Sequence, residues 1–106
     1  MKPKRIRRRF IIFKIEGSLK DSQVDRIILE CFLKFYGIKG IMDIMPTLAF
    51  YDKERSIGIL EVKHDKVKQA KSCLILCSYV KSIGILILRV TGTLRKARAI
   101  ASSLGY

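Results

Sequence analysis

Few residues of this 106-residue chain could carry out catalysis. It has one histidine, His64, and no nucleophile or carboxylate stands in a pattern that would work with it in acid–base or covalent chemistry. The phosphate-binding patterns GxxxxGKS/T and GxGxxG do not occur in the sequence. Most acidic residues fall in predicted turns and helix starts, where capping of the backbone explains them. We therefore expect the chain itself to be non-catalytic and His64 to be a surface residue.

The three cysteines, Cys31, Cys73 and Cys77, form no CxxC pair. An odd number without paired spacing argues against a disulfide framework and against a zinc site with His64 as a fourth ligand. Cys73 and Cys77 fall on an apolar helical face, where a thiol behaves as a small buried hydrophobic group. We expect no metal or cofactor bound by this chain, and we expect a reducing, cytoplasmic location.

One short run combines the groups that bind phosphate. Residues 91–98 read TGTLRKAR, which places hydroxyls, backbone N–H groups and cations together at a predicted helix start. Free N–H groups and the helix dipole attract anions there. Taken alone, Gly92 is an ordinary turn glycine and Thr93 an ordinary N-cap, but the cations that follow favour phosphate. The candidate phosphate-binding residues of this run are Thr91, Gly92, Thr93, Arg95, Lys96 and Arg98.

The charge of the chain is concentrated at its two ends. Residues 1–9 hold six basic and no acidic side chains, residues 66–106 hold eight basic and no acidic ones, and the net charge is +13. The middle, residues 10–65, is close to neutral. Such ends predict a polyanionic partner, of which nucleic acid is the commonest. Further RNA-binding candidates are therefore Lys4, Arg5, Arg7, Arg8, Arg9 and Arg89.

The elements that must position these residues alternate between strands and helices. Aromatic and β-branched runs predict strands at residues 8–16, 47–51, 57–62 and 85–90, with a polar turn between the middle two. Helical spacing predicts three helices, which begin after the candidate caps Ser18 or Asp21, Asp65 and Thr93. Residues 36–40 end the first helix, and the segment 41–45 stays ambiguous. Lysines in residues 66–71 oppose the dipole of the second helix but attract phosphate.

This order predicts an α+β fold, a ferredoxin-like (RRM-like) βαββαβ antiparallel sheet with an additional C-terminal helix. We expect a single domain, residues 1–106, with residues 1–7 as a basic N-terminal arm. The usual strand order of the fold, 4-1-3-2, places the start of the first strand beside the end of the fourth. The two basic ends of the sequence then form one basic patch in space.

The strands do not provide a platform for stacking bases. Phe10 and Phe13 fall on opposite faces of the first strand, and the third strand has no aromatic ring. We therefore predict recognition of nucleic-acid backbone and shape. The apolar strands also require that both sheet faces be covered, one by the first two helices and the other by the last helix or by another protein.

Three segments resemble the archaeal ribonuclease P protein component 2 family, which has relatives in the eukaryotic enzyme: RRFIIFKIE, YDKERSIGILEV and RVTGTLRKA. The resemblance implies a non-catalytic subunit of the ribonucleoprotein that removes 5′ leaders from precursor tRNA. The RNA and its Mg²⁺ would catalyse the cleavage, and this chain would bind and stabilise that RNA. Implied partners are the ribonuclease P RNA, other ribonuclease P proteins, precursor tRNA indirectly, and a TIM-barrel-like protein subunit in a heterotetramer with two copies of each. No membrane partner is implied.

Residue by residue, the resemblance covers Arg8 and Arg9 before the first strand and Gly92, Thr93, Arg95 and Lys96 at the last helix. Two positions depart from the family pattern: Glu61 replaces a basic residue in the third strand, and Thr91 replaces a serine. The alternatives are a stand-alone RNA- or DNA-binding protein of ribosomal or chromatin type, and a ferredoxin-like module that binds a small anion. An exposed apolar patch would favour the subunit over the stand-alone binder.

Overall fold

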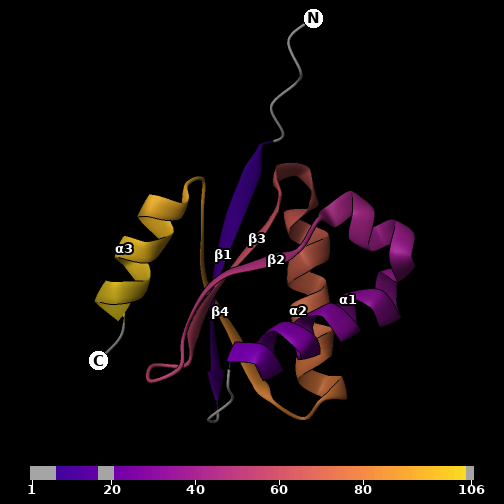
Figure 1. Cartoon of the computed structure of the whole chain (residues 1–106), viewed down its shortest axis with the longest axis horizontal. Helices are drawn as coiled ribbons and strands as arrows, with labels where there is room; N and C mark the ends of the chain where they lie inside the picture. Colours follow the sequence, from indigo (N-terminus) through magenta and orange to yellow (C-terminus); the bar gives the residue numbers. More distant parts are fainter. Residues whose placement is uncertain (1–6, 17–20, 105–106) are drawn as a thin grey trace, which may run out of the picture.

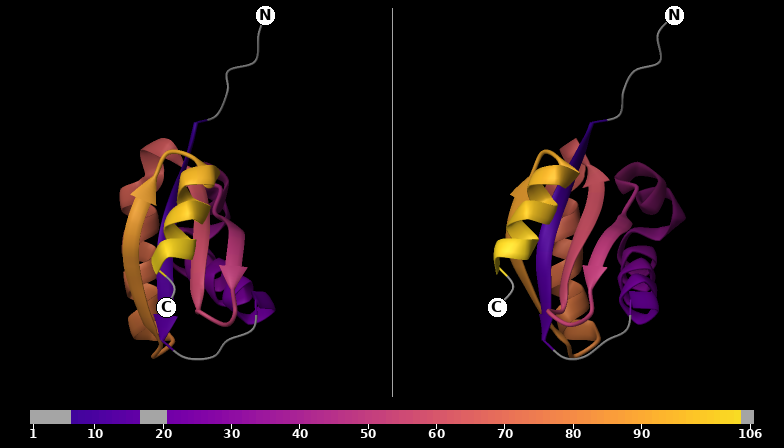
Figure 2. Two further views of the ribbon diagram at one scale, coloured as in Figure 1. Left: turned by 90° about the vertical axis from the view of Figure 1, so that its left-hand side faces the viewer. Right: turned by 60° about the vertical axis from the view of Figure 1, so that its left-hand side comes forward.

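A four-stranded antiparallel sheet lies between a layer of two helices and a single helix in the computed structural model of the chain (Figure 1, Figure 2). The structure describes residues 7–16 and 21–104. Their elements, in chain order, are β1 (Arg8–Glu16), α1 (Asp21–Ile44), β2 (Thr47–Asp52), β3 (Ile57–Lys63), the 3-10 turn η1 (His64–Lys66), α2 (Val67–Val80), β4 (Gly84–Thr91) and α3 (Leu94–Leu104). The predicted α+β architecture with a C-terminal helix is confirmed.

The strands lie in the order β2-β3-β1-β4, and every neighbouring pair is antiparallel. The first strand is therefore central, between β3 and β4, as the sequence predicted. Its side chains alternate between the two faces, with Phe10 and Ile12 on one and Ile11 and Phe13 on the other. All four are buried, which explains why this strand is the most continuously apolar segment of the N-terminal half.

The face under α1 and α2 carries the larger core. Phe13 of β1 packs there with Leu60 of β3, Phe32 of α1 and Leu74 of α2, and each is at most 1% exposed. The ring of Phe13 lies against Gly58 of β3, where a Cβ atom would stand 2.5 Å from Phe13 Cζ. Glycine at this position therefore lets the ring approach the backbone of the neighbouring strand.

The opposite face is covered by α3 alone. Ala97 and Ala101 of this helix pack on Phe10 and Ile12 of β1 and on Ile59 of β3. Of the two covers that the sequence left open for this face, the last helix is the one that the structure shows. Small alanines let the helix lie close to the sheet. The last helix therefore covers the part of this face formed by Phe10, Ile12 and Ile59.

The first helix is longer than predicted and breaks at Gly37. This residue has φ 69° and ψ −177°, which is a non-helical conformation that glycine adopts at little cost. Residues 38–44, the ambiguous segment, continue as a further helical stretch that ends before Pro46. The predicted Asp65 cap is wrong, because Asp65 lies inside η1 and neither η1 nor α2 has a side-chain cap. Ser18 lies outside the described residues.

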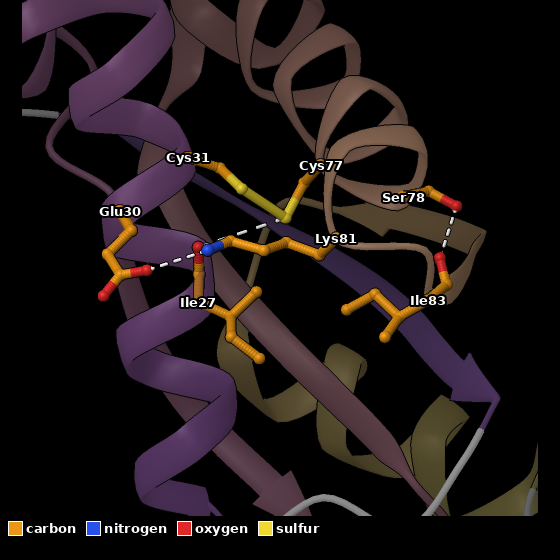
Figure 3. Close-up of a disulfide and its surroundings, with 7 residues drawn as sticks. All are labelled: Ile27, Glu30, Cys31, Cys77, Ser78, Lys81 and Ile83. Carbon is orange, nitrogen blue, oxygen red and sulfur yellow. Dashed lines mark hydrogen bonds and ion pairs between the residues drawn. A yellow bond between two sulfur atoms is a disulfide. The ribbon is translucent and has the colours of Figure 1, made fainter.

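Cys31 of α1 and Cys77 of α2 form a disulfide between Cα atoms 5.7 Å apart (Figure 3). The prediction of no disulfide is wrong, because only the packing of α1 against α2 brings these distant residues together. Beside it, Lys81 Nζ pairs with Glu30 Oε2 at 3.0 Å and Ser78 Oγ donates to the Ile83 carbonyl at 2.6 Å. Cys73 is a free, buried thiol, as expected.

Large apolar side chains remain exposed on the outer surfaces of α1 and α2. Tyr79 is 80% exposed, and the others on these helices are Leu29, Leu33, Ile38, Met42, Ile75, Leu76 and Val80. The sequence had placed such a patch on the sheet. There Leu86 of β4 is 58% exposed, and the other large apolar side chains of the strands are at least partly buried. Within the part of the chain that the structure describes, no helix is long and apolar enough to cross a membrane.

Candidate nucleic-acid interface

The two basic ends of the sequence meet where β1 begins and β4 ends. Phe10 pairs with Thr91 across the two strands, so the residues just before β1 lie beside the residues just after β4. The Arg9 guanidinium lies over the β4–α3 turn, with its Nη1 atom 3.7 Å from the place where a Cβ of Gly92 would stand. The same Nη1 donates to the Arg8 carbonyl at 3.2 Å. The predicted meeting of the two ends is therefore confirmed for Arg9 and Gly92.

The turn into α3 is held by its own hydroxyl groups. Thr91 Oγ1 donates to the Thr93 carbonyl at 3.0 Å, and Thr93 Oγ1 accepts the Lys96 N–H at 3.2 Å. The second bond is an N-cap, so the predicted capping role of Thr93 is confirmed. Each hydroxyl keeps further hydrogen-bonding capacity, because it is both a donor and an acceptor. Threonine thus fixes the start of α3 and can still face a ligand.

The three cations of α3 point in two directions. Arg95, Lys96 and Arg98 are all exposed, while Ala97 between them is buried against the sheet. Arg98 lies 5.5 Å from the centre of the Phe50 ring in β2, a cation–π contact. Since β2 and β4 are opposite edges of the sheet, Arg98 is drawn away from the β4 edge. Arg95 and Lys96 remain at the helix start, beside the turn.

Two further predicted cations are on strands. Arg89 is exposed on β4, opposite Ile12 and next to an irregularity in the register. Arg8 forms an ion pair with Glu61 of β3 at 3.5 Å, and both side chains are partly buried. Glu61, the departure from the family pattern, therefore neutralises part of the Arg8 charge. Of the arginines before and in the first part of β1, Arg7 and Arg9 carry no such carboxylate partner among the described residues.

Arg7 connects this surface to a second one. Its backbone carbonyl accepts the His64 N–H at 3.0 Å and lies 3.3 Å from His64 Nδ1. His64 is exposed in η1, so the prediction of a surface histidine in this connection is confirmed. Lys4 and Arg5 lie outside the described residues.

This arrangement can neutralise phosphates. Exposed guanidinium and ammonium groups gather around the start of α3, and each cation that meets a phosphate releases counterions. In the described part of the chain, no group of three or more His, Cys, Asp or Glu side chains is placed to hold a metal ion. Nor does this part contain a detected pocket for a small substrate. The site is therefore an open, positively charged surface.

Sequence reasoning did not join one group of cations to this end of the sheet. Lys63 is the last residue of β3, which pairs with β1 so that Lys63 lies opposite Arg8. Lys66, Lys68 and Lys71 follow in η1 and α2. Lys63 had been counted with the neutral middle of the chain, and the lysines of α2 only with their own helix. The signal was the antiparallel pairing of the first and third strands, which the predicted order already contained.

The chain is similar to a known protein family, to two named proteins and to a solved structure. The family model described as the Rpp14/Pop5 family matches residues 9–102. "Ribonuclease P protein component 2" of Methanocaldococcus jannaschii is 37% identical over 98 residues, 89% of this chain and 72% of that protein. The protein of the same name from Methanococcus aeolicus is 33% identical over 98 residues, 89% of this chain and 71% of its own. A chain in the cryo-EM structure of yeast ribonuclease MRP has the same fold, with a TM-score of 0.64, 12% identity, and coverage of 97% of this chain and 92% of that one.

Proposed function

The chain belongs to the Rpp14/Pop5 family, and on that premise we propose that it is a non-catalytic protein subunit of ribonuclease P. It binds and stabilises the catalytic RNA of the enzyme, which removes 5′ leaders from precursor tRNA. The observation that carries this proposal is the pairing of Phe10 with Thr91. That pairing turns two separate basic ends into one surface for RNA phosphates.

The surface favours RNA backbone over bases. Phe10 is buried under α3 and Phe13 under α1 and α2, so neither ring of β1 can stack on a base. The exposed groups at the start of α3 are cations, hydroxyls and backbone amides, which bind phosphate and sugar. Structured RNA presents these groups in a shape that such a surface can recognise.

The exposed apolar side chains of α1 and α2 support the subunit role over a stand-alone RNA- or DNA-binding protein. Apolar patches of this kind are typical of protein interaction sites. On α2, Tyr79 is 80% exposed, Ile75 50% and Leu76 42%. We therefore propose that other ribonuclease P proteins join the assembly, among them the TIM-barrel-like subunit in a heterotetramer with two copies of each. In this proposal the particle acts in the cytoplasm, and Mg²⁺ resides on the RNA.

Reconstitution tests this function directly. Cleavage of precursor tRNA is measured with ribonuclease P RNA and the remaining protein subunits, with and without this chain. We expect the chain to raise the rate at low Mg²⁺, since it supplies cations that the RNA otherwise needs from solution. An unchanged rate would contradict the proposal, and so would metal-dependent cleavage by rigorously RNA-free protein.

The start of α3 can be tested separately. Arg95→Ala with Lys96→Ala removes two exposed cations without touching the core. We expect the slope of log K against log salt for RNA binding to fall by about 1.5, at roughly 0.7 to 0.9 for each lost phosphate contact. The melting temperature should stay within 2 °C or so, because exposed charges contribute little to stability. An unchanged slope would show that this helix start does not bind RNA.

A further inference from the structure

A second group of cations lies on the other side of β1 from α3. We call it the α2-side surface, and it consists of Arg7, Lys63, His64, Lys66, Lys68 and Lys71. Its parts are joined by the antiparallel pairing of β1 with β3, which sets Arg8 opposite Lys63, and by the 3.0 Å bond from His64 N–H to the Arg7 carbonyl. Lys68 and Lys71 are three residues apart in α2, so they lie on the same side of that helix.

The cations of this surface have little to pair with in the chain. Among the described residues, none of Lys66, Lys68 and Lys71 forms an ion pair with a carboxylate. The nearby acid is Asp65 in η1, and the first turn of α2 contains no acidic residue. By contrast Lys81, at the other end of α2, pairs with Glu30. The positive charge at the start of α2 is therefore uncompensated.

This placement opposes the stability of the helix. The start of an α-helix carries a partial positive charge, so a lysine there destabilises the helix, whereas an acidic residue would stabilise it. The helix also has no side-chain cap that would offset this cost. A bound polyanion would remove the repulsion. The lysines at the start of α2 therefore disfavour the helix in the free protein and are available to bind an anionic ligand.

The α2-side surface and the start of α3 flank the same strand end. In the sheet order β3-β1-β4, the end of β3 leads into α2 and the end of β4 leads into α3. Neighbouring strands are about 4.8 Å apart, so these two exits stand roughly 10 Å apart on either side of β1. Figure 1 shows both helices starting at the end of the sheet where β1 begins, on opposite sides of the sheet, and Figure 2 shows the same from two other directions.

The far end of the sheet differs in charge. There β1 ends at Glu16, and the turn after β2 carries Asp52 and Glu54 with Lys53 and Arg55 between and after them. Arg55 pairs with Asp52 at 3.7 Å. At that end the acids Glu16, Asp52 and Glu54 accompany Lys53 and Arg55. Around Arg7, Arg8 pairs with Glu61, but Arg7, Lys63 and Lys66 have no ion pair among the described residues. The protein is therefore electrically polar along the strands.

From this geometry we infer that the α2-side surface is a second RNA-binding site, which grips the phosphodiester backbone of the same RNA that binds at the start of α3. This inference rests on the proposed function. The RNA passes over the start of β1, so that phosphates on one side meet Arg95 and Lys96 and phosphates on the other meet Lys66, Lys68 and Lys71. The end of the sheet where β1 begins then lies between two parts of the RNA backbone.

The test uses the full chain and an in vitro transcript of ribonuclease P RNA. Lys66→Ala, Lys68→Ala and Lys71→Ala are combined in one variant. The matched control combines Lys34→Ala, Lys39→Ala and Lys53→Ala, which are exposed lysines elsewhere and change the net charge equally. RNA affinity is measured at several KCl concentrations. A third variant replaces the same three α2-side lysines by arginine and keeps the charge.

We expect the α2-side variant to lose about 2 from the slope of log K against log salt and to bind roughly 100-fold more weakly near 0.1 M salt. The control should change the slope by less than half as much, and the arginine variant should bind like the wild type. The melting temperature of the α2-side variant should be equal to or above that of the wild type, because a repulsion with the helix dipole is removed.

The failures of the two proposals can be told apart. If the α2-side variant matches the control while Arg95→Ala with Lys96→Ala still lowers the slope, this inference is overturned and the proposed function stands. If the wild type itself binds the RNA without a salt-dependent slope, both are overturned. If titration of the wild type shows two RNA molecules bound per protein, the claim that one RNA spans both sites is wrong.

Discussion

The two faces of the sheet are covered in very different ways. On the α1/α2 face, bulky side chains such as Phe13 and Phe32 are fully buried and a disulfide joins the two covering helices. On the α3 face, one helix packs on the sheet through two buried alanines, with Leu94 and Ile100 partly buried beside them. The comparison shows that most of the packing that stabilises the fold lies under α1 and α2. Because α3 contributes less to the core, its exposed positions can carry cations such as Arg95 and Lys96 without loss of packing.

The largest expected effect contrasts the two phenylalanines of β1. Phe13→Ala empties the main core, where the ring is 0% exposed, and should lower the free energy of unfolding by about 4 kcal/mol. Phe10→Ala lies under α3, which can move toward the sheet, and should cost about 2 kcal/mol. Urea unfolding measures both. Equal losses would contradict the comparison of the two faces.

Next in size is the disulfide. Cys31→Ala with Cys77→Ala opens a loop of 46 residues and should lower the free energy of unfolding by about 3 kcal/mol, because the unfolded chain regains conformational freedom. Reductant during refolding should destabilise the wild type and leave this variant unaffected. Alkylation of the denatured wild type followed by mass spectrometry should find one thiol, that of Cys73. Three alkylated thiols would refute the bond.

The buried thiol of the same face predicts a pH effect. Burial raises the pKa of Cys73 from 9.0 to about 12. As the pH rises, the thiol ionises at a lower pH in the unfolded chain than in the folded one. Above pH 9, unfolding therefore releases the proton that the folded state retains. Its contribution to stability is therefore full below pH 9 and is lost as the pH rises toward 12.

This effect is measured against Cys73→Ala. Between pH 9 and pH 11 the wild type should lose more stability than the variant, by up to about 1.4 kcal/mol per pH unit. Identical pH profiles for the two proteins would mean that the thiol ionises in the folded state as easily as in the unfolded one.

The smallest effect belongs to the α3 face. Thr93→Ala removes the acceptor of the Lys96 N–H and should cost about 1 kcal/mol. Thr93→Ser keeps the hydroxyl and serves as the control. Hydrogen exchange of the α3 amides should become faster in the alanine variant while that of α2 does not change. If α2 responds equally, the two faces are more tightly coupled than their cores indicate.

Much of the fold could be predicted because its elements are signalled locally. The alternation in β1 and the glycine and threonine before α3 fix a strand and a capped helix through short-range chemistry. The segment after Gly37 could not be predicted this way, because a glycine signals a helix end and the renewed helix depends on packing of Ile41 and Ile44 against the main core. The Asp65 cap failed because the chain enters α2 through η1.

The candidate site shows the same division. Residues 91–98 could be identified as a phosphate-binding run from their own order, but the partners of its arginines could not. Arg8 lies against Glu61 and Arg98 against Phe50, contacts that join positions about 50 residues apart in the chain. Neither pair has a pattern in the sequence.

By itself, the sequence determined that this protein has an apolar core, two basic ends and a helix start suited to phosphate, because residue type and spacing set charge, periodicity and capping. Only the tertiary structure decided which cations meet. Strand pairing placed Arg9 over Gly92 and Arg7 beside His64, and helix packing joined Cys31 to Cys77. These contacts depend on distances between segments remote in the chain, which no local pattern encodes.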